Sequence, residues 1–226
     1  YEYGIRNTIL VIGYKGENLK NFLGNSYKDM RIQYVVNENY ENTNNIYSLW
    51  LAKNYLQNDD TILLESDVIF EKNIIGKMIK SSYKNLAVVS KYESWMDGTV
   101  TLVDENDNIT SFIPKINFNW ENVNNYYKTV NIYKFSKEFS KETYLPFLEA
   151  YIKVLGKNEY YEQVLRVISY LDGAGIKALK LSNEKWYEID DLQDLDIAST
   201  IFSPAKNKID MYKKRYGGYW RFNKLK

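Results

Sequence analysis

The sequence predicts an α/β fold with a doubly wound, mostly parallel sheet. Three observations indicate this class. Short apolar runs alternate with stretches of helical periodicity, turn residues separate them, and 226 residues are enough to bury one large core. In open sheets of this kind, ligands bind beyond the carboxyl ends of the strands. Functional side chains are therefore expected directly after strands.

The first part of the chain alternates between predicted strands and predicted helices. Leu19, Phe22 and Leu23 have helical spacing after the first apolar run, and the same alternation repeats twice. The predicted strands are residues 8–13, 32–36, 61–64 and 86–89, and the later helices are residues 46–56 and 74–79.

From Thr99 onward the pattern changes. Residues 99–103 and 109–112 flank a polar turn and predict a β-hairpin. A strand (129–135), two helices (137–155 and 160–171), two short strands (176–181 and 186–189) and a helix (192–202) follow. Residues 1–203 are therefore expected to form one domain, and residues 204–226 a tail outside the periodic pattern.

Composition excludes several kinds of function. The chain has 30 basic and 29 acidic side chains, which argues against a nucleic-acid partner held by charge. It has no cysteine and no histidine, so any metal must be bound by carboxylates, which favours Mg²⁺. No apolar run approaches the roughly 20 residues needed to span a bilayer, and no signal segment opens the chain, so a cytoplasmic location is expected.

The clearest acidic motif follows the third strand. Glu65 and Asp67 come at its carboxyl end, where Asp67 is well placed to hold a metal bound to nucleotide phosphates. The alternative is that Asp67 caps a helix or a turn, as aspartates at strand ends often do.

A second acidic cluster follows the strand that begins at Trp186. Asp190 could supply a second ligand to the same magnesium ion, with water and substrate oxygens completing the octahedron. Asp191 precedes a predicted helix, and for this residue the N-cap interpretation is favoured.

Aromatic and acidic residues occur together after several predicted elements. Such groups suit a cationic amine, since ring faces and carboxylates both attract an ammonium. In a chain with 22 tyrosines, packing is the alternative for each ring. Lys91, after the strand at residues 86–89, could contact an acceptor anion or be a solvated strand-end lysine. The clusters comprise Tyr92, Glu93, Trp95 and Asp97; Tyr160, Tyr161 and Glu162; and Trp186, Tyr187 and Glu188.

Taken in order, several motifs resemble the choline-phosphate and aminoethylphosphonate cytidylyltransferases, within the sugar-nucleotidyltransferase-like (nucleotide-diphospho-sugar transferase-like) superfamily. The resemblance covers roughly residues 4–198. The motifs that carry it are Val11-Ile12-Gly13-Tyr14, Asn37-Glu38-Asn39-Tyr40, Asn44-Asn45-Ile46-Tyr47-Ser48-Leu49, the strand ending in Asp67, and Trp186-Tyr187-Glu188-Ile189-Asp190.

The resemblance implies roles for individual residues. Asp67 and Asp190 correspond to the metal ligands, and Asn45 and Ser48 to residues that shape the nucleotide or acceptor pocket. For Asn45, an ordinary N-cap is the alternative. Trp95 and Glu188 match positions that contact the acceptor's cation.

One part of the family pattern has no match. The family's first strand and its glycine-rich, triphosphate-binding loop come before the region that matches Tyr1, and this sequence has no counterpart to them. We expect the sequence to be a fragment of a longer chain, because that strand would be central to the sheet.

The implied function is Mg²⁺-dependent transfer of CMP from CTP to a small zwitterionic acceptor. Among the possible acceptors, 2-aminoethylphosphonate is favoured, because the tail around Tyr216-Gly217-Gly218 resembles the junction to a fused pyridoxal-phosphate aminotransferase. Phosphocholine is the close alternative. A sugar-1-phosphate nucleotidyltransferase, a metal-dependent glycosyltransferase using Glu65-Ser66-Asp67, and a non-catalytic nucleotide-binding domain stay open.

Overall fold

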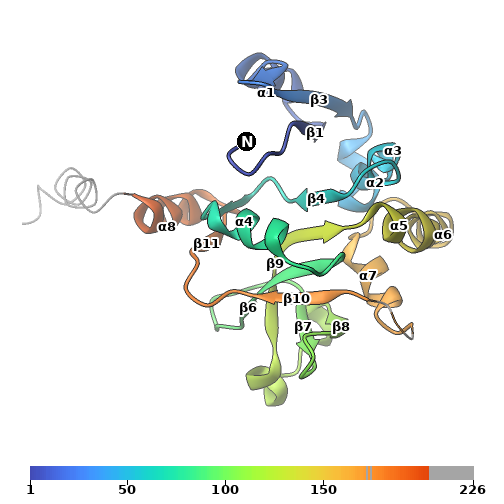
Figure 1. Cartoon of the computed structure of the whole chain (residues 1–226), viewed down its shortest axis with the longest axis vertical. Coiled ribbons are helices and arrows are strands. Elements are labelled where there is room, and N and C mark those ends of the chain that lie inside the picture. The colour runs from blue at the N-terminus through green and yellow to red at the C-terminus, as the bar shows by residue number, and fades with distance from the viewer. Residues whose placement is uncertain (172, 174, 204–226) are drawn as a thin grey trace, which may run out of the picture. The chain divides into compact units, whose positions relative to one another are not determined.

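The computed structural model describes residues 1–171, 173 and 175–203, and the predicted tail 204–226 lies outside them. The chain divides into two compact units (Figure 1). Of the described residues, unit 1 comprises 1–65 and those within 73–182, and unit 2 comprises 66–72 and 183–203.

A three-stranded sheet lies at the N-terminal end of unit 1. β1 (Asn7–Ile12) pairs in parallel with β3 (Met30–Val36), and α1 (Gly16–Leu23) connects them. β2 (Ser26–Tyr27) adds to β3 in the antiparallel direction. This is the βαβ unit that the sequence predicts.

A six-stranded sheet forms the rest of the framework of unit 1. Its strand order is β10-β6-β9-β7-β8, with β4 also paired to β9. The strands are β4 (Thr61–Leu64), β6 (Leu86–Lys91), β7 (Val100–Val103), β8 (Ile109–Ile113), β9 (Tyr127–Phe135) and β10 (Lys177–Lys180).

The α/β class is confirmed, while the sheet is mixed in direction. β10 pairs with β6 in parallel, but β9 runs antiparallel to both β4 and β6. The order of elements along the chain predicts the directions of β4 and β6, but not that a later strand inserts between them. Within the described residues, β4 pairs only with β9, and β1 only with β3.

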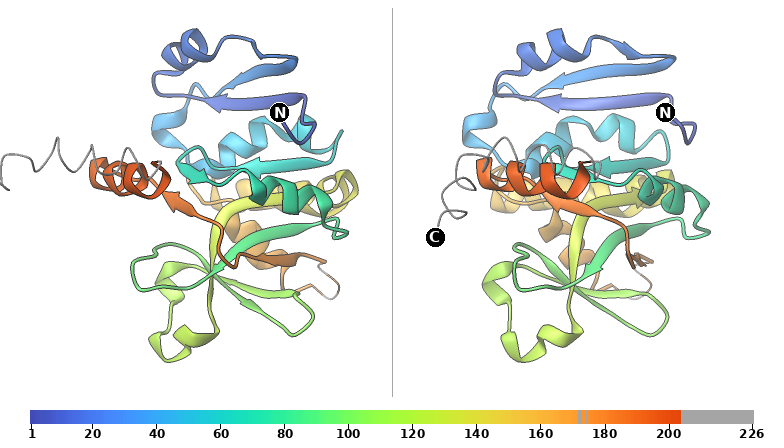
Figure 2. Two further views of the ribbon diagram at one scale, coloured as in Figure 1. Left: turned by 60° about the vertical axis from the view of Figure 1, so that its left-hand side comes forward. Right: turned by 90° about the vertical axis from the view of Figure 1, so that its left-hand side faces the viewer.

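Helices pack against this sheet and close the core (Figure 2). The largest fully buried side chains include Tyr133, Phe135, Tyr144, Leu148 and Leu165, contributed by β9 and the helices after it. The helices are α2 (Asn45–Leu51), α3 (Lys53–Leu56), α4 (Asn73–Lys80), α5 (Lys137–Phe139), the π-helix η4 (Ser140–Tyr144), α6 (Leu145–Leu155) and α7 (Glu162–Ile168). Three short 3₁₀ turns are η1 (Tyr40–Asn42), η2 (Lys115–Asn117) and η3 (Trp120–Asn125).

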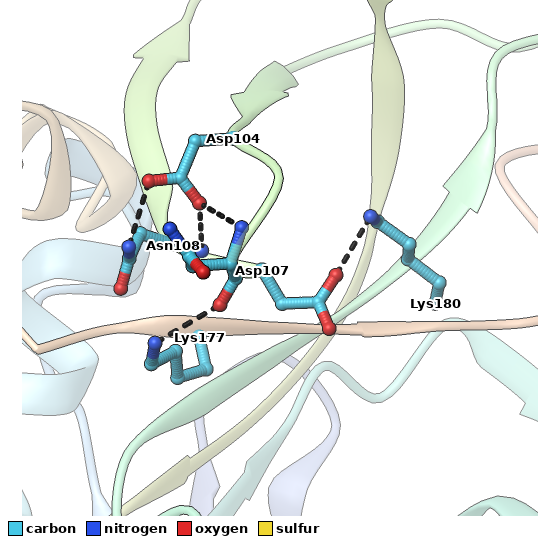
Figure 3. A network of polar contacts seen from close by, with 6 residues as sticks. Asp104, Asp107, Asn108, Lys177 and Lys180 are labelled. Atoms are coloured by element: carbon cyan, nitrogen blue, oxygen red, sulfur yellow. Dashed lines mark hydrogen bonds and ion pairs between the residues drawn. The ribbon is translucent and has the colours of Figure 1, made fainter.

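The predicted hairpin is confirmed, and side chains fix its turn (Figure 3). The Asp104 carboxylate accepts hydrogen bonds from the backbone N–H of Asn106 at 2.9 Å and of Asn108 at 2.8 Å. Lys180 of β10 forms an ion pair with Asp107 at 2.7 Å, and Lys177 donates to the Asn106 carbonyl at 3.0 Å. The turn is thus tied to the edge strand β10.

Unit 2 contains a two-stranded antiparallel sheet and one helix. β5 (Val68–Phe70) pairs with β11 (Trp186–Glu188), and α8 (Leu192–Phe202) follows. Asp191 caps α8 through a capping box with Asp194, which confirms the N-cap interpretation of Asp191. In the part of the chain that the structure describes, no helix has the length and apolar character needed to cross a membrane.

Candidate active site

The Glu65 carboxylate is held by two asparagines at the carboxyl end of β4. The Asn45 side-chain amide donates to Oε1 at 3.1 Å, and the Asn131 amide donates to Oε2 at 3.2 Å. Asn45 begins α2 and Asn131 lies in β9, so the two donors come from different elements. Glu65 is thereby fixed at the edge of the sheet where ligands are expected.

Asn131 adopts a backbone conformation that is uncommon for a residue with a side chain. Its φ is 59°, inside a strand that shows a register shift against β6. The Thr129 hydroxyl lies 3.0 Å from Asn131 Oδ1 and fixes the amide orientation that points Nδ2 at Glu65. Such a conformation costs of order 1 kcal/mol or more and persists where the surrounding structure requires it.

Three buried tyrosines lie near the acidic side chain of Glu162. Tyr133, Tyr144 and Tyr161 have 2% or less of their surface exposed, and Glu162 has 7%. Burial raises the pKa of each of these phenols well above its ordinary value, and the charge of Glu162 adds to the effect. The tyrosines therefore stay neutral at physiological pH.

The candidate metal ligands lie in unit 2. Asp67 directly precedes β5, and the N–H of Ile189 donates to the Asp67 carbonyl at 2.9 Å. This pairing brings one carboxylate oxygen of Asp67 within 4.8 Å of one of Glu188. Two partly buried carboxylates at this separation suit a hard divalent cation such as Mg²⁺.

Asp190 follows two residues after Glu188 and is exposed. Its backbone N–H donates to Asp194 Oδ2 at 3.1 Å. The Tyr187 hydroxyl donates to Asp194 Oδ1 at 3.2 Å, so Asp194 organises the segment from β11 into α8. Burial, followed by this hydrogen bond, raises the pKa of Tyr187.

The predicted acceptor residues Trp95 and Asp97 lie in the loop between β6 and β7. Trp95 is half exposed and donates through Nε1 to Glu93 at 2.9 Å. Asp97 accepts from Lys115 at 2.6 Å and from the Gly98 N–H at 2.7 Å. The hydrogen bond from Lys115 is the main cause of the lowered pKa of Asp97.

Lys91 and Tyr160 occupy surface positions. The Lys91 ammonium donates to the Asn124 carbonyl and lies 4.8 Å from the centre of the Tyr127 ring. Tyr160 precedes α7 with 56% of its surface exposed. These contacts are compatible with the solvated strand-end interpretation of Lys91.

The motifs around β1 and α2 are in contact with one another. Buried Asn37 donates to Thr43 Oγ1 at 3.0 Å and to Ser48 Oγ at 3.2 Å, so Ser48 anchors the segment that follows β3. A Cβ atom at Gly13 would lie 2.7 Å from Tyr40 Cβ, so only glycine fits there without a shift. The helix N-cap is Asn44, which accepts from the Asn45 N–H at 2.8 Å, and this leaves the Asn45 side chain for Glu65.

Two features were not predicted from the sequence. One is the pair of asparagines around Glu65, which are 86 residues apart in the chain (131 − 45). The other is Lys128, of which 1% is exposed although it lies in β9. Lys128 directly precedes the predicted strand 129–135, and this position was the available signal for it.

Comparison with known proteins identifies solved structures that have a similar fold. No family model matches the chain. CTP:phosphocholine cytidylyltransferase from Streptococcus pneumoniae superposes with a TM-score of 0.68 and 20% identity, covering 89% of this chain and 81% of that one. The inositol-1-phosphate CTP transferase from T. maritima has a TM-score of 0.62 and 20% identity over 93% and 77%. A glucose-1-phosphate thymidylyltransferase from Bacillus anthracis, described as putative, has a TM-score of 0.64 and 15% identity over 85% and 74%.

The chain therefore has the nucleotidyltransferase fold, of the nucleotide-diphospho-sugar transferase type. A curated protein, CMP-5'-(3-aminopropyl)phosphonate synthase from Streptomyces rubellomurinus, is 29% identical over 223 residues. That match covers 97% of this chain and 35% of the relative, so the chain spans about a third of the relative's length. The resemblance to CTP-dependent cytidylyltransferases predicted from the sequence is confirmed.

Proposed function

We propose that this chain is the nucleotidyltransferase domain of an Mg²⁺-dependent cytidylyltransferase. It transfers CMP from CTP to 2-aminoethylphosphonate and releases pyrophosphate. The observation that carries the proposal is the match to a CMP-aminoalkylphosphonate synthase along 97% of the chain, on a fold shared with two CTP-using transferases.

The reaction is an in-line attack by a phosphonate oxygen on the α-phosphorus of CTP. A new bond forms between the phosphonate oxygen and the α-phosphorus as the bond from the α-phosphorus to pyrophosphate breaks. Pyrophosphate leaves with the electron pair of the broken bond. The phosphonate oxygen is already anionic, so no general base is required. The protein contributes positioning and charge neutralisation.

Asp67 and Glu188, with Asp190 two residues further along, supply the carboxylates for magnesium. The proximity of the Asp67 and Glu188 oxygens supports this assignment. When bound, the metal neutralises phosphate charge on the nucleotide. Trp95 and Asp97 are the proposed contacts for the acceptor's amine, because a ring face and a carboxylate both favour an ammonium.

The test is pyrophosphate release by the complete protein with CTP, Mg²⁺ and one acceptor at a time. We expect turnover with 2-aminoethylphosphonate and a lower kcat/KM with phosphocholine. A higher kcat/KM with phosphocholine would reverse the choice of acceptor but keep the reaction. Turnover that needs a nucleotide sugar would support the glycosyltransferase alternative, and CTP binding without turnover would support a non-catalytic domain.

A second acceptor is 3-aminopropylphosphonate, which the name of the sequence relative favours. It differs from 2-aminoethylphosphonate by one methylene, a difference that a binding site typically discriminates by about 10- to 200-fold. The same assay with both amines decides between them. The fusion of this domain to an aminotransferase domain stays a prediction.

A further inference from the structure

Charge is distributed unevenly along the chain, although its total is close to zero. The described residues of unit 2, 66–72 and 183–203, carry eight acidic and two basic side chains, a net charge of −6 (2 − 8). Residues 204–226, which lie outside the described part, carry eight basic side chains and one acidic side chain, a net charge of +7 (8 − 1). These opposite charges meet at Ser203, so the chain carries an attraction that its near-neutral total does not show.

α8 has an apolar stripe that faces solvent. Leu192 has 81% of its surface exposed, Leu195 has 48%, and Phe202 is partly buried. Separations of three and seven residues place these side chains along one side of the helix. The regular elements described in unit 2 are β5, β11 and α8, and they leave the two leucines exposed. Such a surface is stabilised when another segment of chain covers it.

The composition of residues 204–226 complements this surface. Besides the basic side chains, the segment contains five aromatic residues, which are Tyr212, Tyr216, Tyr219, Trp220 and Phe222. Aromatic rings can cover leucines while neighbouring lysines and arginines lie over carboxylates. Because the segment is attached directly after α8, it meets this helix at an effective concentration on the order of millimolar. That favours docking within the chain over binding to an external anionic partner such as a membrane.

The segment is long enough to return to the start of α8. The helix has 11 residues and is therefore about 16 Å long. About five residues of extended chain, at about 3.3 Å each, span that length from Ser203. Since 23 residues follow Ser203, most of the segment is left to contact the helix.

We propose that the exposed side of α8, formed by Leu192, Leu195 and the acidic side chains near them, is an intramolecular docking site for residues 204–226. The aromatic side chains of the segment cover the leucines, and its basic side chains neutralise the excess negative charge of unit 2. Docking of this segment is independent of the proposed cytidylyltransferase reaction, so a failure of either one leaves the other standing.

The test uses the full chain of 226 residues, which has no cysteine, so that two nitroxide labels can be attached to introduced cysteines. Gln193→Cys, at an exposed position of α8, and Asn223→Cys carry the labels, since neither side chain is charged or apolar. Labelled chain is diluted with unlabelled chain, and double electron–electron resonance measures the distance between the labels. We expect a narrow distribution at about 0.1 M salt that widens roughly twofold at about 1 M, where the Debye length falls to about 3 Å.

The apolar part of the surface is tested by Leu192→Gln combined with Leu195→Gln. Glutamine keeps a high helix propensity and removes the apolar side chains, so α8 should form but the distance distribution should widen at low salt. Ile116→Gln is the matched control, because Ile116 is an apolar residue of unit 1 with 90% of its surface exposed. This control should keep the distribution of the wild type.

Three results would overturn the proposal: a wide distribution in the wild type at low salt, a narrow one that neither salt nor the leucine variant changes, or equal widening in Ile116→Gln. A distribution that narrows only when phosphatidylserine vesicles are added would overturn it too, and would assign the segment to an anionic membrane. If the leucine variant loses helix by circular dichroism, Lys213→Gln combined with Lys214→Gln takes its place with the same criteria.

Discussion

The side-chain amide of Asn45 joins Glu65 to the start of α7. It donates to Glu65 Oε1 at 3.1 Å and accepts from the Tyr161 backbone N–H at 3.0 Å. Asn45 thus donates a hydrogen bond to a carboxylate at the end of β4 and accepts one from a backbone N–H that lies 116 residues after Asn45 in the chain. The first turn of α2 is thereby attached to both elements.

Asn45→Ala should lower the free energy of unfolding by about 1–3 kcal/mol, because it leaves the Tyr161 N–H and one Glu65 oxygen without this partner in a partly buried site. Chemical denaturation monitored by circular dichroism measures the change. Asn42→Ala is the control, since Asn42 makes an exposed hydrogen bond to Asn39 and should change stability by less than about 0.5 kcal/mol. Equal effects of the two variants would contradict the role of Asn45.

Asp67→Asn should abolish pyrophosphate release while the fold is retained, because a carboxamide is a poor ligand for magnesium. Asp190→Asn and Glu188→Gln should act in the same direction. The measurement is turnover against magnesium concentration, with Glu105→Gln in the hairpin turn as a control for loss of an exposed acid. Near-normal turnover of Asp67→Asn at saturating magnesium would show that the proposed ligand set is wrong.

Trp95→Ala should raise the acceptor KM by roughly two- to thirtyfold and leave the KM for CTP nearly unchanged, as expected for loss of a cation–π contact. Steady-state kinetics with each substrate varied in turn separates the two constants. Trp50→Ala is the matched control, because Trp50 stacks on Tyr47 with ring centres 5.5 Å apart and has no proposed substrate contact. An unchanged acceptor KM in Trp95→Ala would remove this residue from the site.

Asp191→Ala should destabilise α8 by about 1 kcal/mol, because it removes the side-chain acceptor for the N–H groups of Gln193 and Asp194. Asp191→Asn, which can still cap, should recover most of this loss. Thermal denaturation of both variants measures the difference, and an asparagine variant as unstable as the alanine variant would argue against the cap.

Hydrogen bonding to Asn108 lowers the pKa of Asp104, so Asp104 should contribute to a pH-dependent stability. A carboxyl group with a lowered folded-state pKa stabilises the fold above its unfolded pKa of about 3.9, and this contribution is lost as the pH falls through the folded value. Asp104→Ala should therefore be less stable than wild type at pH 7, and the difference should shrink toward pH 2. A difference that is constant with pH would contradict the assignment.

Much of the fold could be predicted from periodicity alone. The strand Thr61–Leu64 and the helix Leu192–Phe202 have the predicted bounds, because an apolar run and a capping aspartate mark them in the sequence. The predicted helix 46–56 is divided at Ala52 into α2 and α3, which periodicity does not show. β5 was also missed, since three residues that pair with a distant strand carry no local pattern.

The candidate site could be predicted only in part. Asp67 follows a strand, so its position along the chain was enough to select it as a metal ligand. Glu188 was predicted from the resemblance as a contact for the acceptor's cation and Asp190 as the second metal ligand, whereas the structure brings the Glu188 carboxylate close to that of Asp67. The contact of Asn45 with Glu65 depends on how α2 packs against β4, and the role of Asn131 depends on a backbone conformation that asparagine tolerates but does not signal. Tertiary packing determines both.

The one-sided pairing of β1 and β4 has a consequence for handling the protein. Each of these strands presents a row of backbone N–H and C=O groups on the side away from its partner in the described chain. Apolar residues such as Ile9, Leu10 and Leu63 in these strands are only partly buried. Such edges are templates for pairing with another polypeptide. Residues 1–226 prepared in isolation should therefore show concentration-dependent self-association, visible as a rising apparent mass in light scattering.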